Sequence, residues 1–124
     1  MPYSIQPSAG LLTVEYSGTL TGTDIHDSIN ELESLVQSLE QWPDNLVDMR
    51  SIELSALTFP DLMSVAKRRE AVIPPNPIRT AIVADQPATM GFARMFQSLN
   101  HNPKITIQVF GDLAEAVAWL HSAR

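Results

Sequence analysis

At 124 residues the chain has the length of one compact domain, and its 44% apolar and 18% charged residues are typical of a globular protein. It contains no cysteine, which excludes disulfides, thiolate metal sites and a cysteine nucleophile. The net charge of −6 excludes nucleic acid as an expected partner, because an acidic chain repels the phosphate backbone. We expect a cytoplasmic protein without an integral membrane segment, since no secretory signal pattern or long apolar run is present.

The first 50 residues predict a hairpin, a long helix and a short strand. Residues 11–18 alternate in the manner of a strand, and residues 3–7 can pair with them across the turn at 8–10. The helix begins at a capping-box pattern, Thr21 with Asp24, and Pro43 ends it. Its apolar stripe consists of Ile25, Ile29, Leu32, Val36 and Leu39. A short strand at 46–49 follows.

The second half predicts alternating helices and strands. A helix from about Phe59 to Val72 is stopped by "IPPNP", and "IRTAIVAD" has the continuous apolar character of a parallel strand covered on both faces. The stretches "ATMGFARMFQSLN" and "ITIQVF" predict a further helix and strand, and a last helix opens at Asp112. The order β-β-α-β-α-β-α-β-α predicts one α/β domain over residues 1–124. Its five-stranded sheet is mostly parallel, with one antiparallel edge strand and helices on both faces.

Three stretches resemble a known family: "NLVDMRSI", "IRTAIVAD" followed by "GFARMFQSL", and the ending "IQVFGDLAEAVAWL". They are similar to the STAS domain of bacterial anti-sigma-factor antagonists, and more specifically to the SpoIIAA-like (STAS/SEC14-type) family of small bacterial proteins. The resemblance implies a non-catalytic regulatory module that binds a protein partner. The SEC14-type relationship suggests an alternative, a carrier or sensor of a small apolar, lipid-like ligand.

Classical antagonists carry an Asp-Ser-Ser-Gly-like motif after the strand that "LVDM" resembles, and a partner kinase phosphorylates a serine there. Counting from Asp48 places Thr58 near that hydroxyl, with Ser55 as a second candidate phosphoacceptor. The matching acid and glycine are absent, so we expect no phosphorylation switch. Thr58 instead stands three residues before Asp61, with Pro60 in the first turn, a pattern that predicts a helix N-cap.

No catalytic, metal or cofactor motif is evident. The sequence has no G-x-S-x-G elbow, P-loop or G-x-G-x-x-G stretch, so we predict no cofactor. The cluster Asp24, His26 and Asp27 lacks the spacing of a metal helix, and we interpret it as a solvated first turn. The best acids and bases of an enzyme would be Asp85, Asp48 and His26, but no pattern places them together. We therefore expect no enzymatic activity.

The basic run 67–69, "KRR", is interpreted as the solvated face of a helix. Residues 1–62 hold ten acidic side chains and one basic side chain, whereas residues 63–124 hold seven basic and four acidic ones. This asymmetry, together with a helix rich in Phe and Met, suggests a homodimer.

One surface is a candidate for a ligand or partner, because open α/β sheets bind ligands at the carboxyl ends of their strands. The polar residues expected there and the apolar residues of the following helix are Ser17, Thr19, Arg50, Ser51, Asp85, Met90, Phe92, Met95 and Phe96. For the Met and Phe side chains, ordinary core packing is the competing interpretation.

Overall fold

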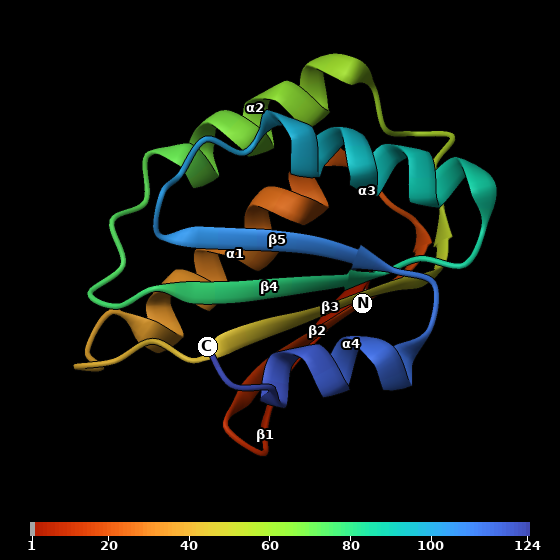
Figure 1. Cartoon of the computed structure of the whole chain (residues 1–124). Coiled ribbons are helices and arrows are strands. Elements are labelled where there is room, and N and C mark those ends of the chain that lie inside the picture. The colour runs from red at the N-terminus through yellow and green to blue at the C-terminus, as the bar shows by residue number, and fades with distance from the viewer. Residues whose placement is uncertain (1) are drawn as a thin grey trace.

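The computed structural model describes residues 2–124 and confirms the predicted order of elements (Figure 1). The elements are β1 (Tyr3–Ser8), β2 (Leu11–Thr19), α1 (Gly22–Val36), β3 (Asp44–Glu53), α2 (Phe59–Glu70), β4 (Ile78–Val83), α3 (Pro87–Leu99), β5 (Ile105–Phe110) and α4 (Leu113–His121). Within these residues, no helix combines the length and the apolar character that crossing a membrane requires.

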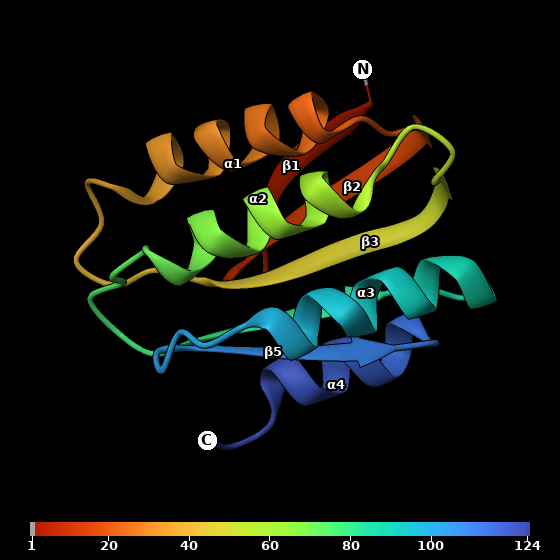
Figure 2. The same ribbon diagram turned by 90° about the horizontal axis from the view of Figure 1, so that it is seen from above.

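The five strands form one sheet in the order β1-β2-β3-β4-β5. The edge strand β1 runs antiparallel to β2, and all other neighbours are parallel, as predicted. From β2 to β5, each strand lies next to the preceding one, always on the same side of it. Connections between parallel strands are right-handed, so with this strand order the helix of each connection lies on the same face of the sheet. Consequently α1, α2 and α3 cover one face, while α4 alone lies on the other (Figure 2).

Two apolar cores lie on the two faces of the sheet. The larger core packs α1, α2 and α3 against the sheet, with Val14, Leu20 and Val65 among its buried members. The smaller core joins α4 to the opposite face through residues such as Ala81 and Leu120.

Two helix starts follow the predicted chemistry. The Thr21 hydroxyl accepts from the N–H of Asp24 at 3.1 Å, and the Asp24 carboxylate accepts from the N–H of Thr21 at 3.0 Å. At α4, the Asp112 carboxylate accepts from the N–H of Ala114 at 2.7 Å and from that of Glu115 at 3.3 Å. Each cap satisfies N–H groups that have no partner inside the helix.

The first long helix is shorter than predicted, and one strand is longer. Helix α1 ends at Val36, so Leu39 lies beyond it and is 46% exposed instead of continuing the buried stripe. Strand β3 runs to Glu53, beyond the predicted end at Met49. It extends because β2 has an irregularity after Glu15, past which its last residues pair again with residues 51–53 of β3.

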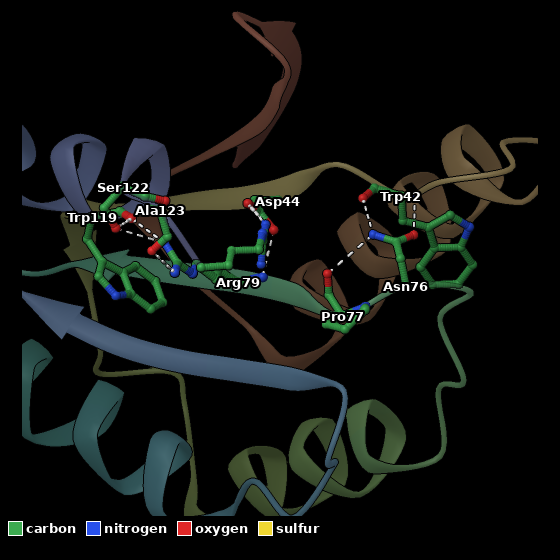
Figure 3. A network of polar contacts seen from close by, with 9 residues as sticks. Trp42, Asp44, Asn76, Pro77, Arg79, Trp119, Ser122 and Ala123 are labelled. Atoms are coloured by element: carbon green, nitrogen blue, oxygen red, sulfur yellow. Dashed lines mark hydrogen bonds and ion pairs between the residues drawn. The ribbon is translucent and has the colours of Figure 1, made fainter.

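The C-terminal helix is attached to the sheet by Arg79 of β4 (Figure 3). Its guanidinium donates to the carbonyl oxygens of Trp119 at 2.6 Å, Ser122 at 3.2 Å and Ala123 at 3.1 Å. The guanidinium carbon also lies 5.1 Å from the centre of a Trp119 ring. A cation at the carboxyl end of a helix satisfies free carbonyls and complements the helix dipole. Arg79 therefore ends α4 and holds it against β4.

Candidate functional site

The N-terminus of α2 is closed by a complete capping box, which confirms the predicted role of Thr58. Its hydroxyl accepts from the N–H of Asp61 at 3.2 Å, and the Asp61 carboxylate accepts from the N–H of Thr58 at 3.0 Å. The helix end therefore already has a negative charge beside it, and a phosphate on Thr58 would face that carboxylate. Ser55 is exposed in the preceding turn.

Next to this cap, two large apolar side chains of α2 face solvent. Phe59 is 58% exposed and Met63 is 41% exposed. Residues four apart on a helix are neighbours on one surface, so the pair forms a contiguous patch, here called the α2 patch. The sequence held a signal for it, because both residues lie off the buried stripe that begins at Leu62 and Val65.

The three residues that would be the best acids and base of an enzyme do not all come together: Asp85 lies near the Asp48–Arg50 pair, and His26 lies elsewhere, between α1 and α2. The Arg50 guanidinium binds both carboxylate oxygens of Asp48, with Nε–Oδ1 at 3.0 Å and Nη2–Oδ2 at 2.8 Å. These hydrogen bonds lower the pKa of Asp48, which leaves it a poor base at neutral pH. His26 instead hydrogen-bonds Ser64 across α1 and α2, through Nε2 at 3.1 Å. Asp85 is exposed after β4.

The residues predicted to form one ligand surface separate into two groups. The polar members are exposed near the carboxyl edge of the sheet: Ser17, Thr19, Arg50, Ser51 and Asp85. Arg50 and Ser51 lie inside β3 and not in a loop, because that strand continues to Glu53. On α3, Met95 is 45% exposed and Met90 is partly buried. Phe92 and Phe96 pack against the larger core instead of joining the polar members.

A cavity of about 90 Å³ lies inside the larger core, between the sheet and the three helices. Phe92 and Phe96 are part of its largely apolar lining. Four side chains with polar groups also line it: Tyr16 of β2, whose hydroxyl is hydrogen-bonded to that of Ser28, Asn45 of β3, Thr80 of β4 and Arg69 of α2. The Thr80 hydroxyl oxygen is fully buried and has no hydrogen-bond partner within residues 2–124.

The interpretation of residues 67–69 as a solvated face was wrong for two of the three. Arg68 joins α2 to α1, with its Nη1 3.1 Å from Nδ1 of His26 and its Nη2 3.0 Å from Oε1 of Glu33. Arg69 lines the core cavity. The reason is helical geometry, since Arg69 stands seven residues after Leu62 and four after Val65, on the buried face of α2. Of the three, only Lys67 is exposed.

A second, open hollow of about 790 Å³ lies at the amino ends of the strands. Leu35 and Leu39 contribute its exposed apolar side chains, at 47% and 46% exposure. Its rim includes Trp42, whose backbone N–H donates to the Asn76 side-chain oxygen at 2.7 Å and whose carbonyl accepts from the Asn76 amide at 3.0 Å (Figure 3). This hollow was not predicted, because a helix that continues through Leu39 leaves no room for it, whereas α1 ends at Val36.

Across the part of the chain that the structure describes, no group of three or more His, Asp or Glu side chains is arranged to hold a metal ion. The candidate features are an apolar surface patch, an exposed polar edge, an open hollow and a core cavity with an arginine.

A family model described as SpoIIAA-like matches residues 11–121. The chain belongs to the SpoIIAA-like family. No curated protein matches this SpoIIAA-like chain.

Two solved structures are similar to this SpoIIAA-like protein. An uncharacterised protein of the DUF3478 family from Shewanella loihica PV-4, with a SpoIIAA-like fold, is 18% identical with a TM-score of 0.63, covering 95% of this chain and 91% of the other. An anti-sigma factor antagonist from Mycobacterium paratuberculosis is 17% identical with a TM-score of 0.66, covering 97% of this chain and 93% of the other. At these identities the likeness shows the fold alone.

Proposed function

We propose that this protein is a non-catalytic regulatory module that binds a protein partner through the α2 patch. The observation that carries the proposal is the pair Phe59 and Met63, apolar and 58% and 41% exposed beside the start of α2. Exposed apolar side chains that adjoin on one surface are a common mark of a protein interface. Membership of the SpoIIAA-like family and the fold shared with an anti-sigma factor antagonist support a regulatory role.

The proposed module works without a phosphorylation switch. The Thr58 hydroxyl is engaged in the capping box, and the Asp61 carboxylate occupies the position where a phosphate would gain most from the helix end. We therefore expect the protein purified from its host to have the mass of the unmodified chain. One added phosphoryl group mapped to Thr58 or Ser55 would contradict this part of the proposal.

A matched pair of variants tests the α2 patch. Phe59→Ser with Met63→Ser removes the patch, and Ile73→Ser removes an apolar side chain of 84% exposure outside it. Partners retained from the host by the unmodified chain are identified, purified and titrated calorimetrically against all three proteins. We expect the double variant to bind at least tenfold more weakly and the control to bind normally. Equal affinity of the double variant and the unmodified chain would refute the assignment of this surface.

A second candidate function, a carrier or sensor of a small apolar ligand, is favoured by the core cavity. Its volume of about 90 Å³ is well below the roughly 300 Å³ of a typical small-molecule site, so it suits a ligand of a few atoms and not a lipid chain. The predicted homodimer remains a prediction, and native mass spectrometry of the purified chain tests it.

A further inference from the structure

The core cavity contains a cation without an anion. No carboxylate within residues 2–124 lies at ion-pair distance from Arg69, whereas Arg50, Arg68 and Arg124 each form an ion pair. The nearby Glu33 is engaged by Arg68 at 3.0 Å. Burial lowers the pKa of Arg69, because the charged form loses hydration, yet a guanidinium stays protonated in proteins. Arg69 as a whole residue is only partly buried, so this loss of hydration is incomplete, but a guanidinium without an anion still favours one that can reach it.

Two further polar groups line the same cavity. Asn45 and Thr80 face each other across β3 and β4, where they are register partners, and they are only 6% and 7% exposed. The Thr80 hydroxyl has no hydrogen-bond partner among the described residues. Buried polar side chains are nearly always hydrogen-bonded, so an unpaired hydroxyl in a cavity that an arginine also lines favours a polar occupant.

The size and the apolar lining limit what that occupant is. A cavity of about 150 Å³ accepts the six carbons of benzene, so by proportion 90 Å³ accepts about four heavy atoms. Phe92 and Phe96 supply an apolar wall, which suits a short alkyl group. A carboxylate suits the guanidinium, which offers it two parallel N–H donors.

We propose that the core cavity is a binding site for a monocarboxylate of the size of acetate. The carboxylate pairs with Arg69, the Thr80 hydroxyl and the Asn45 amide offer further hydrogen bonds, and the methyl group lies against Phe92 and Phe96. This inference rests on the second candidate function and changes the class of its ligand, from a purely apolar molecule to one with a charged head and a short apolar end. It is independent of the α2 patch, which lies on the outer surface of the molecule.

The test is a titration of the full chain with carboxyl-¹³C-labelled acetate, followed by NMR of the labelled carbon. We expect saturable binding that Arg69→Met weakens by about tenfold or more, since hydrogen bonds to a charged group are worth roughly 1.5–3 kcal/mol. Lys67→Met is the matched control, because it removes one positive charge from α2 at an exposed position that does not line the cavity. It should bind acetate normally.

Neutral acetamide has nearly the same shape as acetate and should not displace it. Thr80→Val should weaken acetate binding severalfold while preserving the shape of the site. No saturable binding by the unmodified chain, equal binding by Arg69→Met, or displacement by acetamide would each overturn the inference. If Arg69→Met does not fold, Thr80→Val and acetamide still decide. If the chain retains its protein partner but does not bind acetate, this inference fails while the proposed partner binding stands.

Discussion

The unpaired hydroxyl of Thr80 leads to a stability prediction that can be worked from the structure. Its oxygen is buried without a partner among the described residues, and such a group costs about 1–3 kcal/mol. Valine has nearly the same shape and removes the hydroxyl, so Thr80→Val replaces an unsatisfied polar atom with a methyl group. In the ligand-free protein we expect a gain of about 1 kcal/mol, the low end of this range, because valine also suits a strand.

For a chain of this length, a gain of about 1 kcal/mol corresponds to a rise in melting temperature of about 4 °C. Urea unfolding followed by circular dichroism measures the free-energy change directly. The control is Thr106→Val on β5, where the threonine is exposed and the exchange reports only strand preference. The difference between the two variants isolates the buried hydroxyl.

The reasoning would be refuted if Thr80→Val lost stability while Thr106→Val did not. That result would mean that the hydroxyl has a hydrogen-bond partner in solution, which an ordered water in the cavity can provide. With acetate present, the gain from Thr80→Val should shrink, because the ligand then supplies the missing partner and binds the threonine protein more tightly.

Three further predictions concern stability. Arg79→Met should lower the free energy of unfolding by about 2 kcal/mol, because several hydrogen bonds to the end of α4 are lost; urea unfolding measures this. Amide hydrogen exchange should accelerate more in α4 than in the other helices. Ala9→Asn should stabilise the β1–β2 hairpin by about 0.5–1 kcal/mol, because Ala9 has a φ of 52°, a left-handed conformation that asparagine tolerates better. An unchanged melting temperature would contradict this prediction. The pair Asp48–Arg50 lowers the pKa of Asp48, so its contribution is present above the usual aspartate pKa of about 4 and is lost as pH falls below it. Asp48→Asn should therefore flatten the acid limb of the stability–pH curve by about 1 kcal/mol or less, with no change in slope near pH 7.

Local patterns in the sequence determined the kind and order of the elements. Alternation and helical spacing depend only on neighbouring residues, so they indicated five strands and four helices in the order that the structure confirms. Thr21 and Thr58 marked helix starts for the same reason, since a capping box is complete within four residues. The chemistry at these positions requires no knowledge of the rest of the fold.

Features that depend on a partner distant in the sequence were decided by the tertiary structure. Strand β3 continues to Glu53 because the end of β2 pairs with it, and the polar side chains in that stretch carry no apolar pattern to reveal this. Three helices share one face because the strand order advances steadily, and the sequence holds no signal for strand order. The residues predicted to form one ligand surface lie in two places, because Phe92 and Phe96 pack against the larger core.

The environment of Arg69 depends both on a local pattern and on distant parts of the chain. Its spacing from Leu62 and Val65 was present in the sequence, and it places the side chain on the buried face of α2. The charge favoured the opposite interpretation, because an arginine within a basic run is usually solvated. Only the packing of α2 against the sheet showed that this arginine meets a cavity, with Thr80 from a strand 11 residues further along the chain as its neighbour in the lining. A local pattern can place a side chain on a face, but what it faces depends on chain segments that come together only on folding.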